Sequence, residues 1–125
     1  MWINALNSGE YRKGRGCLVS EQPCGGDKFC CLGVLSNVFI ERSKAGRDFS
    51  FEKVDSPYSS RLYFDGTDAY SLPDIVGEWA GITEDEIEHI NTLIDMNDSV
   101  SHHKDGAIRD KYTFKRIAKY IEKNL

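Results

Sequence analysis

The sequence lacks a long apolar run, an excess of basic charge and any repeated segment, and each absence excludes a class of protein. No stretch approaches the roughly 18 apolar residues of a membrane-spanning helix. Only 3 of the 125 residues are proline, and 40% are hydrophobic and 29% charged, which is typical of a folded domain rather than a disordered chain. The net charge of −4 argues against nucleic acid as the main partner.

Motifs that would identify a reaction or a location are also missing. The full dinucleotide-binding and phosphate-loop patterns are absent, and we expect no cofactor. Residues 1–7 contain neither a basic region nor a long apolar core, so we expect no secretory signal and a location in the cytosol. A chain of this length buries about two thirds of its unfolded surface, so we predict one domain over 1–125 that needs neither metal nor disulfides.

Four cysteines are present, at positions 17, 24, 30 and 31. A reducing compartment disfavours disulfides between them. Cys30 and Cys31 are adjacent at the start of a predicted helix, where the helix dipole lowers a thiol pKa. Cys30 is therefore a candidate nucleophile, with His89, His102 or His103 as its base. The alternative is that both cysteines are small core residues.

Metal sites are weakly indicated. Cys17, Cys24 and Cys30 with one histidine could form a zinc site, but the spacing C-x6-C-x5-C-C differs from the usual C-x2-C or C-x4-C pairs. His102 and His103 with Asp98 and Asp105 could bind a metal loosely, or could simply be surface residues. We predict no metal.

Apolar residues at three- and four-residue spacing predict five helices, over about 2–8, 30–42, 73–80, 83–98 and 113–125. Asp27 could cap the second helix, Thr83 and Glu86 form a capping-box pattern, and Thr113 could cap the last. In the fourth helix the residues expected to face inward are Ile87, Ile90, Leu93 and Ile94.

Short strands are predicted over 17–19 and 49–54, and a hairpin over 61–70 with Asp65 and Gly66 at its turn. The polar stretch 99–112 is predicted to be a mobile loop. The fold class is therefore α+β, with about five helices packed on a small antiparallel sheet that contains one β-hairpin.

Two groups of basic residues are candidate binding sites. Backbone N–H groups and side chains of a glycine-rich loop could hold an anion, although the loop could be a plain turn; it consists of Arg12, Lys13, Gly14, Arg15 and Gly16. Basic side chains of the last helix could contact nucleic acid, although a solvated helix face explains them equally; they are Lys115, Arg116, Lys119 and Lys123.

Charge is distributed unevenly along the chain. Residues 49–100 carry two basic and twelve acidic residues, whereas residues 101–125 carry seven basic and three acidic ones. The simplest interpretation is that the basic tail lies near the acidic middle. Such pairings at a surface are weak, so they indicate little about stability.

Several segments resemble a family of small uncharacterised proteins of tailed bacteriophages and prophages. They are Ser8-Gly9-x-Tyr11, Gly14-x-Gly16-x-Leu18, Phe29-Cys30-Cys31-Leu32-Gly33-Val34-Leu35, Trp79-Ala80-Gly81-Ile82, Asn97-Asp98 and Thr113-Phe114-x-x-Ile117-Ala118-x-x-Ile121-Glu122. The resemblance spans nearly the whole chain and implies expression inside an infected bacterium. It implies no activity and no catalytic residues.

Three functions remain open. The first is a phage-encoded accessory protein that binds a host or defence protein, and the absence of a catalytic constellation favours it. The second is a small cysteine-dependent hydrolase that uses Cys30. The third is a nucleic-acid-binding accessory protein that uses the basic C-terminal helix. Neither the oligomeric state nor the identity of a partner follows from the sequence.

Overall fold

The computed structural model describes residues 1–20, 26–53, 61–64 and 71–125, and these form an α+β fold, as predicted. Their helices are α1 (Trp2–Asn7), α2 (Cys31–Arg42), α3 (Asp74–Ala80), α4 (Ile87–Asp98) and α5 (Phe114–Asn124), with single 3-10 turns η1 (Ala45–Asp48) and η2 (Glu84–Glu86). The larger sheet contains β1 (Arg12–Lys13), β2 (Val19–Ser20), β3 (Lys28–Phe29), β4 (Phe51–Lys53) and β5 (Arg61–Phe64).

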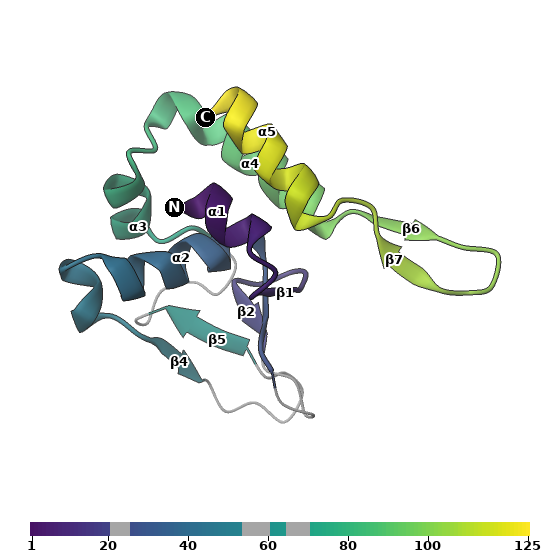
Figure 1. Ribbon diagram of the computed structural model, residues 1–125, viewed down its shortest axis with the longest axis horizontal. Helices are drawn as coiled ribbons and strands as arrows, with labels where there is room; N and C mark the ends of the chain where they lie inside the picture. Colours follow the sequence, from purple (N-terminus) through teal and green to yellow (C-terminus); the bar gives the residue numbers. More distant parts are fainter. Residues whose placement is uncertain (21–25, 54–60, 65–70) are drawn as a thin grey trace.

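Helix α2 is the centre of the fold. The sheet lies along one side of it, and the other helices lie on its opposite side (Figure 1). A helix enclosed in this way is apolar on nearly every side. Its buried residues are Cys31, Leu32, Gly33, Val34, Leu35, Ser36, Val38 and Phe39. The one hydroxyl among them donates to a carbonyl of the preceding turn, because Ser36 Oγ lies 2.9 Å from the Leu32 oxygen.

The larger sheet has the strand order β1-β3-β2-β5-β4 and is mixed rather than purely antiparallel. Strands β1 and β3 run parallel, with Arg12 opposite Lys28, while the other pairs are antiparallel. The prediction of an antiparallel sheet is therefore wrong at this edge. Strands of two residues are too short for their hydrophobic pattern to indicate a direction. The predicted turn at Asp65 and Gly66, with the strand after it, lies outside the described residues.

The segment 99–112, for which a loop was predicted, contains a β-hairpin. Strands β6 (Val100–His102) and β7 (Ile108–Asp110) pair antiparallel, with Ser101 opposite Arg109. Gly106 has a φ of +83° in the connecting turn, a conformation that glycine adopts without strain. The hairpin projects sideways from the body between α4 and α5 (Figure 1). None of its residues is fully buried, so no buried face gives the apolar alternation by which strands are recognised.

The helices begin largely as their capping residues predict. Thr83 forms the predicted capping box with Glu86, and Thr113 Oγ1 accepts the N–H of Arg116 at 3.3 Å. Asp27 is not the cap of α2. Cys30 holds that position, and its Sγ accepts the N–H of Gly33 at 3.3 Å.

The inward face of α4 differs from the prediction at one position. Ile90 and Leu93 are buried and Ile94 is half-buried, but Ile87 exposes 52% of its surface. Ile87 is the first residue of α4 and is not among the residues that form the hydrophobic core or pack against it. Within the described parts of the chain, every helix is too short or too polar to cross a bilayer.

Candidate functional site

A buried asparagine joins three segments that are distant in the sequence. Asn97 exposes 1% of its surface, and its Oδ1 accepts the N–H of Cys31 at 3.0 Å. Its Nδ2 donates to the carbonyl of Gly14 and to Asp98 Oδ1, both at 3.0 Å. The same Asp98 oxygen accepts the N–H of Gly16 at 3.0 Å. We call Gly14, Gly16, Cys31, Asn97 and Asp98 the Asn97 junction.

The anion-binding candidate loop takes part in this junction, and its donors bind groups of the chain itself. Lys13 Nζ lies 2.5 Å from the Asn97 carbonyl oxygen and 3.2 Å from Asp110 Oδ1. Arg15 Nε lies 3.4 Å from the same Asp110 oxygen. Gly14 N–H donates to the carbonyl of Phe29 at 2.8 Å. The anionic groups that this loop contacts are therefore the carboxylates of Asp98 and Asp110 in the same chain.

Cys30 lies beside the junction in an environment that opposes reactivity. It exposes 8% of its surface and borders a cavity of about 160 Å³. Burial raises the pKa of Cys30 to about 11, although the N–H groups of Gly33 and Leu32 lower it. Burial also raises the pKa of Cys31. The helix N-terminus was expected to lower the pKa of Cys30, and desolvation outweighs that effect.

The histidines lie elsewhere. His89 Nδ1 is 2.8 Å from the hydroxyl of Tyr120, so this ring links α4 to α5. His102 and His103 belong to the projecting hairpin and are exposed. No described histidine borders the cavity next to Cys30. Over the described ranges, no three histidine, cysteine or acidic side chains are grouped so that they could hold a metal ion. Cys24, one of the zinc candidates, lies outside those ranges.

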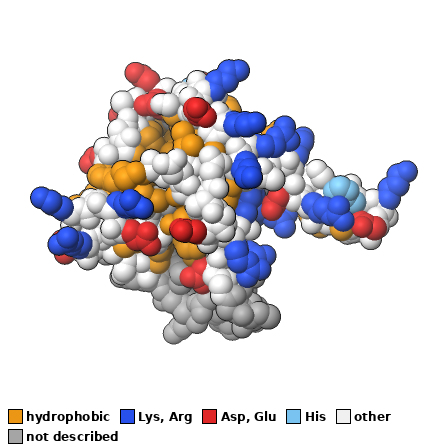
Figure 2. Space-filling model, viewed as in Figure 1, with side chains coloured by type: hydrophobic (Ala, Val, Ile, Leu, Met, Phe, Trp, Pro, Cys, Tyr) orange, Lys and Arg blue, Asp and Glu red, His pale blue; other side chains and the backbone are white. Residues whose placement is uncertain are grey.

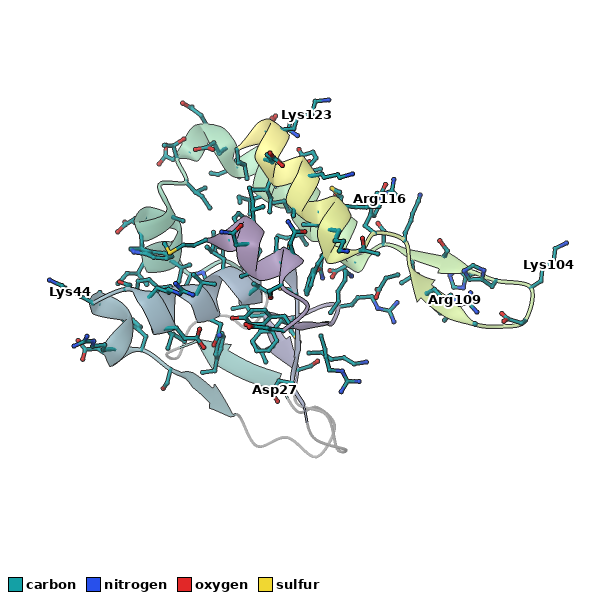
Figure 3. All side chains as sticks on the ribbon, in the orientation of Figure 1. Asp27, Lys44, Lys104, Arg109, Arg116 and Lys123 are labelled. Carbon is teal, nitrogen blue, oxygen red and sulfur yellow. The ribbon has the colours of Figure 1, made fainter. Side chains whose placement is uncertain are left out.

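The basic residues of α5 form an exposed face. They are Lys115, Arg116, Lys119 and Lys123. The guanidinium of Arg116 lies 5.1 Å from the ring centroid of Tyr112, a cation–π distance. Arg116 and Lys123 point away from the body, and Lys104 and Arg109 extend the basic side chains onto the hairpin (Figure 3).

A groove between α3 and α4 is the site that sequence reasoning missed. It is an open depression of about 490 Å³. Its floor is apolar and its rim acidic: the floor includes Leu72, Ile82, Ile87, Ile90 and Ile94, and the rim Asp74, Glu78 and Glu84. We call this the α3–α4 groove. Acidic side chains gather at the upper left of the molecule, where α3 leads into α4, and basic ones lie at the right over α5 and the hairpin, with a further basic group at the left edge (Figure 2).

Signals for both missed features were present in the sequence. Asn97 follows Ile90 and Leu93 at helical spacing, which places an amide on the buried face of α4. A polar group at such a position must be hydrogen-bonded. For the groove, the first turn of α4 holds Ile87 between Glu86 and Glu88, an apolar residue in an acidic surrounding.

Comparisons with known proteins give a family but no activity. Searches of curated proteins and of solved structures found no match. One family model, described as "Domain of unknown function (DUF8296)", matches residues 1–125. The match covers the whole chain, so the protein belongs to this family, the domain of unknown function DUF8296.

Proposed function

We propose that this protein is a non-enzymatic binding protein that acts in the cytosol of an infected bacterium by binding a host or defence protein. One observation carries the proposal: the candidate anion-binding loop and Cys30 make their contacts within the fold, while apolar surface stays open to solvent. Lys13 and Arg15 bind Asp110, and Cys30 caps a helix. Ile87, by contrast, exposes 52% of its surface in the α3–α4 groove.

The hydrolase alternative requires a thiolate and a base. Burial raises the pKa of Cys30 to about 11, so the thiol is protonated near neutral pH and is a weak nucleophile. The measured rate of alkylation by iodoacetamide at neutral pH tests this directly. We expect Cys30 to react only after denaturation. Rapid reaction of Cys30 in the folded protein would favour the hydrolase instead.

Nucleic-acid binding is a second candidate, favoured by the exposed basic face of α5. Its test is retention on heparin at low salt for the wild type and for a variant with Lys115, Arg116 and Lys119 changed to Glu. Retention of the wild type that the triple change removes would support this candidate. Absence of retention at low salt would end it, because phosphate contacts are strongest there.

The binding function itself is tested by affinity capture from bacterial lysate. The tagged full chain is the bait, and an unrelated tagged protein of similar size and net charge is the control. We expect one protein to be recovered in stoichiometric amount with this chain only. Recovery of none, in lysates from cells with and without defence systems, would contradict the proposal.

A further inference from the structure

The floor of the α3–α4 groove is apolar surface that the fold leaves in contact with water. Ile87 exposes 52% of its surface, whereas Ile90, on the same helix, exposes 9%. Leu72, Ile82 and Ile94 are half-buried and continue the floor toward the core. Covering such a surface is favourable because it removes apolar area from water. The edge of the hydrophobic core is therefore accessible to another molecule at this position.

The rim of the groove carries charge of one sign. Asp74 and Glu78 lie one turn apart on α3, Glu84 lies in η2, and all three are exposed. The sequence has no lysine or arginine between Arg61 and Lys104, and no basic residue borders the groove in the described part of the chain. The rim therefore complements a cationic partner.

The shape of the groove selects among possible occupants. Small-molecule sites enclose about 70–90% of their ligand, and an open depression between two helices does not. An apolar floor between charged rims suits a helix that presents anchor residues at i, i+3, i+4 and i+7. We propose that the α3–α4 groove binds an amphipathic helical segment of a partner protein, with apolar side chains on its floor and flanking lysine or arginine residues paired with the rim. This proposal rests on the binding function above and names the partner's chemistry.

The chain's own basic helix does not meet this description. The apolar side chains of α5 are already in the core, among them Phe114, Ile117 and Ile121. From its basic helix, a second copy of the protein could therefore offer the groove only a polar face. The occupant we infer is a different protein, with apolar and basic residues on one helix.

The test uses a fluorescein-labelled synthetic peptide of about five helical turns, ~18 residues. It carries leucine at the anchor spacing and lysine beside it, and fluorescence anisotropy measures its binding to the full-length protein. One control peptide replaces every lysine with glutamate, and another has the same composition without the amphipathic spacing. We expect saturable binding of the first peptide only. We also expect it to weaken between ~50 mM and ~300 mM salt, because exposed charges are screened.

Two matched variants locate the binding. Ile87→Lys places a charge on the groove floor, and Ile108→Lys makes the same change on the hairpin, where Ile108 exposes 54% of its surface. Neither residue is buried, so both variants should fold. We expect Ile87→Lys to weaken peptide binding at least about tenfold, equivalent to ~1.4 kcal/mol, and Ile108→Lys to leave it unchanged.

Three results of the binding assay would each overturn the proposal. The first is the absence of saturable binding below about 1 mM peptide. The second is that the glutamate peptide binds as well as the lysine peptide, and the third is that the Ile87→Lys variant binds as well as the wild type. Sedimentation that shows a dimer broken by Ile87→Lys would also overturn it, since the occupant would then be a second copy.

Lysate capture distinguishes failure of this proposal from failure of the proposed function. A partner that is retained by Ile87→Lys but lost with Ile108→Lys would leave the binding function standing and would assign it to another surface. A partner lost only with Ile87→Lys, together with the peptide result, would support both.

Discussion

The Asn97 junction and the α3–α4 groove lie toward opposite ends of the same helix, α4, and treat their side chains in opposite ways. At the C-terminal end, Asn97 is buried and both atoms of its amide group are hydrogen-bonded. At the N-terminal end, Ile87 is exposed and its neighbours are carboxylates. A polar side chain is thus buried at one end of α4, and an apolar side chain is exposed to solvent at the other.

The comparison separates residues that maintain the fold from residues available to a partner. The junction and its immediate neighbours contain the groups that first suggest chemistry: the thiols of Cys30 and Cys31, the glycine-rich loop with Lys13, and Asp98. Their partners are one another, so they specify how the loop, α2 and α4 meet. No thiol, lysine or glycine-rich loop borders the groove in the described part of the chain, yet its apolar floor is the surface that the fold leaves uncovered.

The largest difference between the two regions is expected for glycine-to-alanine changes. A Cβ at Gly33 would collide with the backbone oxygen of Leu18 and lie 2.7 Å from its carbonyl carbon. Gly77 borders the groove, and a Cβ there would meet only Leu72 Cδ2, at 3.5 Å. We expect Gly33→Ala to lower the free energy of unfolding by about 3–5 kcal/mol or to prevent folding. We expect Gly77→Ala to raise it by about 0.5–1 kcal/mol, since alanine favours a helix interior.

Urea unfolding followed by circular dichroism measures both variants. A Gly33→Ala protein as stable as the wild type would show that α2 and Leu18 are less closely packed than the structure has them. The tight packing assigned to the junction side of the molecule would then be wrong.

Two asparagines on α4 provide the next test. Asn97→Ala leaves the N–H of Cys31 and the carbonyl of Gly14 without their side-chain partner in a buried setting. We expect it to lower the free energy of unfolding by about 2–4 kcal/mol. Asn91 is exposed at the groove, and Asn91→Ala should change stability by less than about 0.5 kcal/mol. Equal unfolding midpoints for the two variants in urea would remove the distinction between junction and groove.

The sequence predicted the helices better than it predicted these contacts. Periodic apolar residues and caps are local signals, so α5 was predicted from the cap Thr113 and an apolar face that begins at Phe114 and Ile117 and continues through Ala118, Ile121 and Leu125. The partners of Asn97 are 66 residues away at Cys31 and 83 residues away at Gly14, and no local pattern records such a distance.

The errors have the same cause. The parallel pairing of β1 with β3 depends on a contact between two strands of two residues each, Arg12–Lys13 and Lys28–Phe29. The hairpin 100–110 has no buried face, so its sequence does not show the alternation of apolar and polar residues that predicts a strand. The inward prediction for Ile87 followed the helical period correctly, but whether a core reaches that turn depends on where α3 lies.

The pH dependence of stability tests the burial of the thiols beside the junction. Burial raises the pKa of Cys30 from 9.0 to about 11, so the unfolded chain loses this proton first as the pH rises. The contribution of the protonated Cys30 thiol to the free energy of unfolding is therefore fully present below pH 9 and is lost as the pH rises toward 11. The total loss is about 2.7 kcal/mol or less. Cys31 changes stability in the same direction.

Urea unfolding at a series of alkaline pH values measures this loss, and Cys30→Ser is the control. A serine hydroxyl can still accept the N–H of Gly33, so the helix keeps its cap without a thiol that titrates in this range. We expect the alkaline decline to be smaller in Cys30→Ser. A decline as steep as that of the wild type would place the titrating group elsewhere.

The smallest effect on stability is expected where the junction meets the hairpin. Two aspartates test whether the junction extends into it: Asp110 in β7 and Asp105 in the connecting turn. Asp110 receives both Lys13 and Arg15 and exposes 34% of its side chain, whereas Asp105 pairs with Arg109 and both of these side chains are more than 60% exposed. Because solvent screens such pairs, we expect Asp110→Asn to lower stability by about 0.5–1 kcal/mol and Asp105→Asn to have no measurable effect. Hydrogen exchange of the amides of Ser101 and Arg109 should accelerate in Asp110→Asn only. Equal exchange in both variants would mean that the hairpin is held by its own strand pairing, and that the junction ends at Asp98.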